Sequence, residues 1–398
     1  MSAPVIQGWC PGALRPMMSG DGLVVRVRPH AGRLSQEQAA GIASLAGRYG
    51  NGLIDLSSRA NLQIRGVREG TWEPLIDGLR ALDLIDENIS AETRRNIVVT
   101  PFWHEGDGTV EIASALERAL VATGAPTVPG KFGFSVDSAF HPSGLSGVSA
   151  DIRIAPCFGG WLVYGDTFLT GAVVETPDSA AEAAMELAHW FVSSGGIVDG
   201  RGRMARLWAD VEVDVRNRRL PGRFQQRGVR FATDSGVKAG PHDLGFLVGF
   251  EFGQMEAETL SILAKCGPLR VTPWRMILIE GATSAPRIPG IITESTDPLL
   301  RVTACTGAPG CLQALIATRP LARALGISLA PDARLHVSGC SKGCAHPGAA
   351  PLTLVGEAGG TVAVVRNGPA SGAPVCRGLN PDTLTLNDLT EALNAPQL

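Results

Sequence analysis

Two stretches of the chain, 20–67 and 240–281, share one order of hydrophobic and polar patterns. In each, a strand-like run is followed by a segment with apolar residues at helical spacing, and then by two short strand-like runs around a polar turn. The first stretch predicts a strand, a helix and a strand pair over 21–28, 35–49 and 52–66. The second predicts the same series over 245–250, 255–266 and 269–279. This repetition predicts a pseudo-symmetric α+β domain built from both stretches.

The rest of the chain divides into a middle and a C-terminal segment. The middle segment predicts strands at 94–101 and 131–136 and helices at 111–122 and 180–192. The C-terminal segment predicts a helix at 312–325, a strand at 334–337 and a strand pair around 352–366. Four units are expected. They are a first half-repeat (1–92), a middle α+β domain for the substrate and active site (93–235), a second half-repeat that pairs with the first (236–289) and a cluster domain (290–398).

Four cysteines in the C-terminal segment form a C-x5-C pair and a C-x3-C pair within glycine-rich sequence: Cys305, Cys311, Cys340 and Cys344. Four thiolates can hold a [4Fe–4S] cluster, and small neighbours let the backbone fold tightly and point N–H groups at sulfur. The spacing differs from the C-x2-C of a zinc ribbon, and disulfides or core cysteines seldom cluster in this way. The pattern therefore predicts one cluster. The other cysteines show no spacing for a second: Cys10, Cys157, Cys266 and Cys376.

Composition narrows the function classes. The chain has 398 residues, 44% of them hydrophobic, which is enough for two or three domains with their own cores. Eight cysteines are too few for a disulfide scaffold, and the first residues lack the apolar region of a signal peptide, so a reducing, cytoplasmic setting is expected. No run of 18 apolar residues occurs, and the net charge is −3, so neither a membrane nor a nucleic acid is an expected partner.

These residues resemble the sulfite and nitrite reductase family, whose cluster motif is C-x5-C followed by C-x3-C. The resemblance covers most of the chain and includes, beside the cysteines, Ser58-Arg59-Ala60-Asn61-Leu62-Gln63, Arg95-Asn96, Lys131-Phe132 and Arg270-Val271-Thr272-Pro273-Trp274. It implies an α+β fold in which pseudo-twofold ferredoxin-like repeats stand beside iron–sulfur domains. The chain is most similar to the branch that acts in aerobic cobalamin biosynthesis, through its modest length and through Trp9-Cys10-Pro11-Gly12, Arg15-Pro16 and Ser19-Gly20-Asp21-Gly22.

One departure from the family pattern bears on the reaction. In the sulfite reductases of this family, four basic side chains surround a small anion over the sirohaem iron, and two of them come from a Lys-x-Lys strand. Here that strand reads Lys131-Phe132-Gly133, while Arg59 and Arg95 fall where the other two would be. A buried anion needs matched positive charge, so the missing lysine argues against sulfite reduction. Gly133 also predicts space for a bulkier ligand.

A site for a polycarboxylated tetrapyrrole needs several basic side chains, because each carboxylate takes a charge-assisted partner. Four candidates alternate along one predicted strand and would share its face: Arg59, Asn61, Gln63 and Arg65. The full set of candidate substrate-binding residues adds Arg95, Lys131, Arg270 and Arg275. For Arg65 and Arg275 taken singly, an ordinary solvated charged face is an equally good interpretation.

Two further features favour plain structural roles. Residues 216–230 carry six arginines, which indicate an exposed basic loop more than a docking surface for an acidic electron donor. His336 and His346 flank the second cysteine pair, and a single histidine is more often a packing or hydrogen-bonding residue than a metal ligand.

The resemblance implies an iron–sulfur monooxygenase with a tetrapyrrole as substrate. Such an enzyme takes precorrin-3A, O2 and two electrons from a reductase or ferredoxin, hydroxylates C20 and closes a ring-A lactone to give precorrin-3B. The family picture includes a further non-haem iron, but no 2-His-1-carboxylate set and no catalytic residue can be assigned here. A sirohaem-dependent nitrite or sulfite reductase is the alternative. A non-enzymatic tetrapyrrole or cluster carrier is a third hypothesis, disfavoured because a carrier needs no buried cluster beside its binding site.

Overall fold

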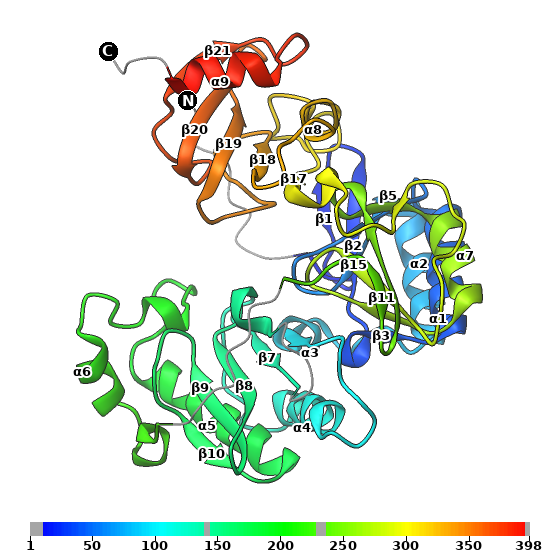
Figure 1. The fold of residues 1–398 in the computed structure, drawn as a ribbon. Helices are drawn as coiled ribbons and strands as arrows, with labels where there is room; N and C mark the ends of the chain where they lie inside the picture. Colours follow the sequence, from blue (N-terminus) through cyan, green and yellow to red (C-terminus); the bar gives the residue numbers. More distant parts are fainter. Residues whose placement is uncertain (1–10, 139–143, 228–235, 395–398) are drawn as a thin grey trace.

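The computed structural model has three lobes (Figure 1). The structure describes residues 11–138, 144–227 and 236–394. We call the three parts the repeat lobe (11–84 and 236–292), the middle lobe (89–227) and the cysteine lobe (298–394). In Figure 1 the cysteine lobe, in orange and red, lies above the other two, and the middle lobe is in cyan and green. No helix within the described ranges is long and apolar enough to cross a membrane.

Two antiparallel sheets form the repeat lobe. The first sheet has the order β1 (Met17–Ser19), β2 (Gly22–Val27), β5 (Leu62–Val67), β4 (Leu53–Leu56) and β13 (Gln254–Glu256). The second has the order β11 (Gly240–His242), β12 (Gly245–Phe250), β15 (Met276–Glu280), β14 (Leu269–Val271) and β3 (Arg33–Leu34), with β16 (Ile291–Ile292) beside β12. The helices of this lobe are α1 (Gln36–Tyr49), α2 (Glu69–Ala81) and α7 (Ala257–Cys266).

The two half-repeats exchange a strand. Leu34 of β3 pairs with Leu269 in the second sheet, and Met255 of β13 pairs with Ile54 in the first. Each exchanged strand follows a kink at a residue with positive φ, 49° at one kink and 56° at the other. The same sequence of strand, kink, exchanged strand, helix and strand pair therefore occurs twice. This arrangement confirms the predicted pseudo-symmetric α+β fold class.

Helix α1 shows why the predicted helices form. Ser35 accepts a hydrogen bond from the backbone N–H of Gln38, whose side chain accepts one from the N–H of Ser35, so the first turn is capped. Its apolar stripe, which includes the fully buried Ile42, packs against α7 in the interior of the repeat lobe. Truncating such a residue to alanine typically costs about 2–5 kcal/mol.

The outer face of the first sheet is polar. Arg26, Gln63, Asp55 and Gln254 are cross-strand neighbours in one row, and the Gln254 amide donates to Asp55 Oδ1 at 3.0 Å. The intervening residues of these strands point into the hydrophobic interior. This row is the side of the repeat lobe that meets the cysteine lobe, because Arg319 of the cysteine lobe pairs with Asp55 at 2.9 Å.

The outer face of the second sheet is apolar at one end and charged at the other, where Arg33 and Arg270 pair with Glu280. Leu247, Met276 and Leu278 form a small cluster at the apolar end with Phe102 of the middle lobe. The pseudo-symmetry is thus broken in chemistry, since the second sheet packs against the middle lobe through an apolar cluster and Arg270, whereas the first carries a polar row toward the cysteine lobe. Sequence periodicity predicted the strands but not this difference.

The middle lobe is a mixed sheet covered by helices. Its order is β10 (Ala172–Val174), β9 (Gly160–Gly165), β8 (Ile152–Cys157), β7 (Phe134–Val136) and β6 (Ile97–Val99), with β6, β7 and β8 parallel. The helices are α3 (Ile89–Arg94), α4 (Thr109–Val121), α5 (Pro177–Ser193) and α6 (Val213–Arg218). Two predicted strands prove shorter than expected. Arg95 follows α3, and Lys131–Gly133 form the turn before β7, where Phe132 N–H bonds back to Pro129 O.

The cysteine lobe contains a sheet in the order β17 (Val302–Ala304), β18 (Leu335–Ser338), β19 (Ala350–Gly356), β20 (Val362–Gly368) and β21 (Cys376–Leu379), with α8 (Thr318–Gly326) and α9 (Leu386–Asn394). The first three strands are parallel. The predicted helix at 312–325 begins six residues late. Residues 312–317 form turns instead, because Leu315 N–H bonds to Gly339 O and Ala308 N–H bonds to Ile316 O.

Candidate iron–sulfur site and the adjoining cleft

Two loops carry the four predicted cluster cysteines. The first cysteine loop, residues 305–311, follows β17, and the second, residues 340–346, follows β18. Because β17 and β18 are parallel neighbours, both loops leave the same edge of the sheet. Cys305 N–H bonds to Val337 O at 3.2 Å, and Gly339 N–H points at Cys305 Sγ, also at 3.2 Å. The loops are therefore tied together, and an N–H group faces sulfur as the glycine pattern predicted.

Close packing requires two glycines at this edge. A β-carbon on Gly339 would lie 2.6 Å from Cβ of Ala314, which is closer than real side chains approach. A β-carbon on Gly307, whose φ is +69°, would overlap the Thr318 hydroxyl, which donates a 2.6 Å hydrogen bond to Cys305 O. These contacts fix the backbone of both loops.

The four thiols form one electrostatic group. Burial raises the pKa of Cys340 and of Cys344, and the charges of Cys305 and Cys311 raise both further, against a lowering by Lys342. Within the described ranges, no three His, Cys, Asp or Glu side chains converge on a point where one metal ion could sit. A [4Fe–4S] cluster differs from an ion because each cysteine binds its own iron, so its ligands surround a volume. The residues present fit such a cluster, and the ligand assignment stays a prediction.

The repeat lobe holds the first cysteine loop through the carbonyl of Gly310. That oxygen accepts hydrogen bonds from Arg65 Nη2 at 2.9 Å, Ser19 Oγ at 2.6 Å and Gly20 N–H at 3.2 Å. Both carboxylate oxygens of Asp21 accept hydrogen bonds from the Arg65 guanidinium, at 2.6 and 3.0 Å. The Ser19–Gly22 hairpin turn therefore docks on the cysteine lobe. Arg65, predicted as a substrate ligand, is committed to this contact.

Arg275 holds the second cysteine loop in the corresponding way. Its Nη2 donates to Ala345 O at 2.6 Å. Arg275 adopts a φ of +61°, and Gly253 leaves room for its stem, since a β-carbon on Gly253 would lie 2.8 Å from Cδ of Arg275. Burial lowers the pKa of Arg275, and the nearby charge of Arg319 lowers it further. Arg65 and Arg275 thus reach the two cysteine loops from the two half-repeats.

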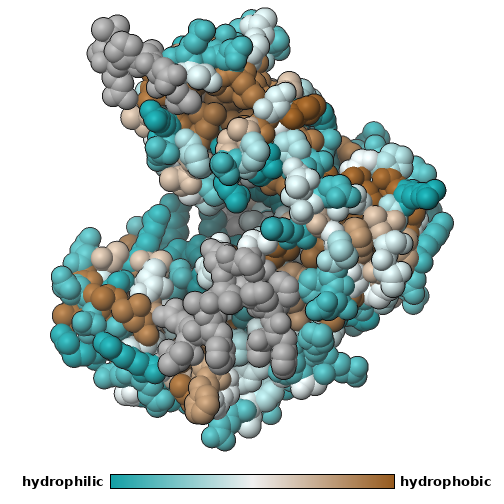
Figure 2. Space-filling model, viewed as in Figure 1, coloured by the Kyte–Doolittle hydropathy of each residue, from teal (hydrophilic) through white to brown (hydrophobic). Residues whose placement is uncertain are grey.

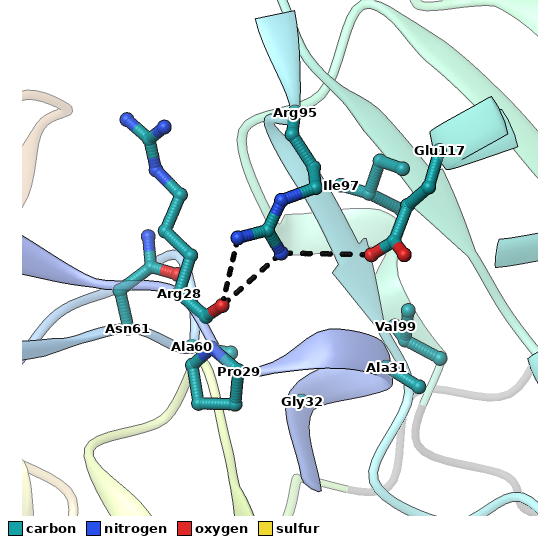
Figure 3. A pocket seen from close by; sticks show the side chains of 10 residues that line it. All are labelled: Arg28, Pro29, Ala31, Gly32, Ala60, Asn61, Arg95, Ile97, Val99 and Glu117. Carbon is teal, nitrogen blue, oxygen red and sulfur yellow. Dashed lines mark hydrogen bonds and ion pairs between the residues drawn. The ribbon is translucent and has the colours of Figure 1, made fainter. Parts of the chain in front are cut away.

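Arg95 is not available to a ligand. Its guanidinium forms a bidentate ion pair with Asp86 at 2.6 and 2.9 Å. It also approaches Glu117 at 3.5 Å and donates to the carbonyl of Arg28 (Figure 3). The predicted role of Arg95 in binding an anion or a carboxylate is therefore not supported, because its charge is already neutralised in a buried position. Asn61, another candidate, is also buried, and together with Arg95 it lines a small pocket between the repeat and middle lobes (Figure 3).

Arg59 and Lys131 come together at the edge of the repeat and middle lobes. Arg59 Nη2 donates to the backbone carbonyl of Lys131 at 3.1 Å, and Lys131 is exposed. Arg59 lies in the turn between β4 and β5, so the expectation that it shares a strand face with Gln63 and Arg65 is wrong for Arg59 and Asn61. Only Gln63 and Arg65 share that face, because β5 begins at Leu62.

Gly133 does not make room for a ligand. A β-carbon there would lie 2.6 Å from Nδ2 and 3.0 Å from the carbonyl oxygen of Asn96. The Gly133 N–H also donates to the buried carboxylate of Asp151 at 3.0 Å. The prediction of ligand space at this position is therefore wrong, because Asn96 fills it. Position 133 still lacks the second lysine of the family's Lys-x-Lys strand, and glycine carries no charge.

Arg270 has a structural role. It pairs with Glu280 at 2.5 Å, donates to the carbonyls of Pro101 and Trp103, and lies 3.6 Å from the centre of the Trp103 ring. These contacts join the second sheet to the middle lobe. The interpretation of Arg270 as a substrate ligand is not supported.

Sequence reasoning overlooked Arg26, whereas His336 has the packing role that it favoured. Arg26 alternates with Val25 and Val27 on a predicted strand, so its place on the polar face beside Gln63 could have been found. His336 is 1% exposed, and neither ring nitrogen has a hydrogen-bond partner in the described structure. Its ring lies edge-on to that of His346 at 5.5 Å, and burial, with His346 and Arg275 adding to it, lowers its pKa to about 4. His336 is therefore neutral at pH 7.

Two arginines of the arginine-rich segment have local partners. Arg219 stacks on Trp208 at 4.6 Å, and Arg223 pairs with Glu186. These contacts agree with the basic-loop interpretation. Cys10 and Arg230 lie outside the described residues.

The three lobes border a hollow. Figure 2 shows the surface indented between the cysteine lobe and the middle lobe, with hydrophilic side chains along its border. The contact of Arg59 with Lys131 joins the repeat lobe to the middle lobe, and the contact of Arg65 with Gly310 joins it to the cysteine lobe. The polar row of the first sheet lies on the side of the repeat lobe that contacts the cysteine lobe.

Comparison with known proteins agrees with this architecture. Residues 15–82 match the nitrite/sulfite reductase ferredoxin-like half domain. The chain is 29% identical to a precorrin-3B synthase from Sinorhizobium sp, over 94% of this chain and 85% of that protein. The resemblance to precorrin-3B synthase, of the sulfite and nitrite reductase family, is confirmed.

Two other proteins are similar to this chain over most of its length. A ferredoxin–nitrite reductase from Synechococcus elongatus is 24% identical over 86% of this chain and 77% of its own length. The solved structure of the NirA protein of Mycobacterium tuberculosis superposes with a TM-score of 0.62 and 14% identity, covering 91% of this chain and 78% of that one. The chain therefore has the sulfite and nitrite reductase-like fold, and its named relatives are oxidoreductases.

Proposed function

We propose that this protein is a precorrin-3B synthase, an iron–sulfur monooxygenase that converts precorrin-3A to precorrin-3B. The observation that carries the proposal is the charge at the four positions where the sulfite reductases of this family have a basic side chain, which here are Arg59, Arg95, Lys131 and Gly133. Arg95 is neutralised by Asp86 and Glu117, and Gly133 supplies no charge and is packed against Asn96. Two of the four positions therefore supply no available cation, and such a site lacks the positive charge that a small dianion in a dry environment requires.

The substrate would bind in the hollow between the lobes. A tetrapyrrole with several carboxylates is a large, flat anion, and it requires cations spread around its rim instead of gathered at a point. Arg59 and Lys131 at the lobe edge, together with Arg26 and Gln63 on the polar row, are distributed in that way. Gln63 stays a candidate ligand, whereas Arg65, Arg95 and Arg270 are assigned structural roles.

The four cysteines would hold a [4Fe–4S] cluster, which relays single electrons when bound. In the overall reaction one oxygen atom of O2 enters the substrate at C20, and the other leaves as water after two electrons and two protons arrive. The electrons come from a reductase or ferredoxin, and the ring-A acetate closes the lactone. The chain's own residues bind and orient the tetrapyrrole carboxylates beside the cysteine lobe. No group of three or more His, Cys, Asp or Glu side chains that could hold a further iron occurs in the described ranges.

The test is turnover by purified protein reconstituted with iron and sulfide. Precorrin-3A, a chemical reductant and 18O2 should yield a product that carries one 18O atom, detected by mass spectrometry. Absence of labelled product with an intact cluster spectrum would refute the proposal. A Cys344→Ser variant serves as the control for reaction without the cluster.

A sirohaem-dependent nitrite or sulfite reductase remains the second candidate, favoured by the retained contact of Arg59 with Lys131 and by the nitrite reductase relative. Protein of that kind would bind added sirohaem with a characteristic visible spectrum. It would also turn over nitrite or sulfite at ordinary enzyme rates, about 1 s⁻¹ or more. We expect neither result.

A further inference from the structure

One arginine contacts each of the two cysteine loops, and the two arginines differ in whether a carboxylate pairs with them. Arg65 donates to Gly310 O in the first cysteine loop, and Arg275 donates to Ala345 O in the second. They come from different half-repeats and were both predicted as substrate ligands. Both guanidinium groups are instead directed at the backbone that carries the cysteines.

The charge of Arg65 is fully compensated. Asp21 binds it in bidentate fashion, and Asp55 lies 3.7 Å from its Nε. The side chain of Arg65 is only 5% exposed, so this pair forms a closed unit with no net charge. Its effect on the cysteine site is therefore mainly mechanical, through the Gly310 carbonyl.

The charge of Arg275 is not compensated by any carboxylate within 4 Å in the described structure, and its hydrogen bond goes to a neutral carbonyl. The charged groups that act on it are Arg319, Asp55 and Cys305. A partly buried cation without a paired anion is costly unless another negative group balances it. The fold nevertheless places Arg275 in a positive-φ conformation, with Gly253 clearing space for its stem.

We propose that Arg275 is a positioning residue that supplies the counter-charge of the cysteine site and raises the reduction potential of its iron–sulfur group. The inference rests on the proposed [4Fe–4S] cluster. Four thiolates give such a cluster a net negative charge, and reduction adds one more, so a nearby cation stabilises the reduced form. The neutral Arg65–Asp21 pair holds the first loop without this effect.

The two arginines provide a matched comparison. Arg275→Gln removes the charge and keeps an amide that can donate to Ala345 O, and Arg275→Lys keeps the charge. The control is the double variant Arg65→Gln with Asp21→Asn, which removes a neutral pair. Each purified protein is assayed for iron and acid-labile sulfide and then titrated with dithionite under electron paramagnetic resonance.

The potential of Arg275→Gln should fall by the equivalent of at least tenfold in the redox equilibrium, about 59 mV for one electron. Arg275→Lys and the double variant should stay within half of that shift from wild type. Equal shifts in Arg275→Gln and the double variant, or no shift in either, would overturn the assignment.

The iron and sulfide content of each variant decides the outcome when a variant fails to retain the cluster. If Arg275→Gln folds by circular dichroism but loses its iron, the proposal requires Arg275→Lys and the double variant to retain theirs. Loss in the double variant to the same degree would show that both arginines act mechanically. Wild-type protein without iron and sulfide would instead refute the cluster itself, which is a separate result.

Discussion

Replacing Gly20 by alanine tests how the hairpin turn holds the first cysteine loop. A β-carbon on Gly20 would overlap the carbonyl oxygen of Pro309 and lie 3.1 Å from the carbonyl carbon of Gly310. Both neighbours are backbone atoms, so no side chain can move aside. The turn must therefore withdraw from the cysteine lobe and weaken the hydrogen bonds that converge on Gly310 O.

The structure sets the size of this effect. Loss of the two neutral bonds, from Ser19 and from the N–H of residue 20, costs about 1 kcal/mol at the least, and loss of the charged Arg65 bond as well brings the cost to about 6 kcal/mol at the most. Even the lower figure corresponds to about a fivefold change in an equilibrium constant.

The assay is hydrogen exchange of the peptides that cover 17–22 and 305–316, together with urea unfolding. Gly20→Ala should speed exchange in both peptides by at least about fivefold. Gly47→Ala is the matched control, because Gly47 lies exposed in α1 with nothing within 4 Å of its added β-carbon, and it should stabilise the helix by about 0.5–1 kcal/mol. Unchanged exchange at 305–316 in Gly20→Ala would refute the docking role of the turn.

Three further predictions follow from the site and the lobe contacts. Serine in place of any one cluster cysteine should remove most iron and sulfide, whereas Cys266→Ser should not; wild-type iron content in two of the four variants would contradict the ligand set Cys305, Cys311, Cys340 and Cys344. Burial alone would raise the pKa of Glu280, but hydrogen bonds from two arginines lower it below its ordinary 4.5, so its stabilising contribution is present above that pH and is lost as the pH falls through the lowered pKa. The stability difference between wild type and Glu280→Gln, measured by urea unfolding from pH 7 to pH 3, should therefore shrink on acidification; a constant difference would contradict this. Arg95→Ala should cost about 3–5 kcal/mol of stability by leaving a buried carboxylate unpaired. Arg59→Ala and Lys131→Ala should instead weaken precorrin-3A binding and lose less stability than Arg95→Ala. Calorimetry that reversed these two outcomes would count against the assignment.

The sequence predicted the strand and helix order of both half-repeats because their alternation and helical spacing are local properties. It also predicted that the two glycine-rich cysteine pairs come together, and the structure joins their loops at one edge of a sheet, whereas the cluster itself stays a prediction. It could not predict which arginines face a ligand, since a sequence shows charge but not pairing. Arg95 and Arg270 have carboxylate partners that come from separate elements, and Arg65 depends on a hairpin turn 44 residues away.

The role of Gly133 could not be predicted from the sequence either. The sequence shows that position 133 lacks a lysine, but only the packed structure shows that Asn96 occupies the space. The late start of α8 has the same cause, because residues 312–317 satisfy their backbone groups through contacts with distant loops that no local pattern reports. Local periodicity therefore predicted the elements, and long-range contacts decided their boundaries and the roles of charged residues.

The exchanged strands have a consequence for synthesis on the ribosome. The first sheet is completed by Gln254, whose partner Asp55 stands 199 positions earlier in the chain. Until β13 emerges, β4 is an open edge with unpaired N–H and C=O groups, and the entire middle lobe must be made in the meantime. The N-terminal half is thus a nascent chain with a prolonged exposed edge, the kind of intermediate that recruits chaperones or pairs with its neighbours on a polysome. A ribosome stall within the middle lobe would leave a fragment prone to aggregation, whereas a stall beyond residue 292 would leave both sheets with their full set of strands.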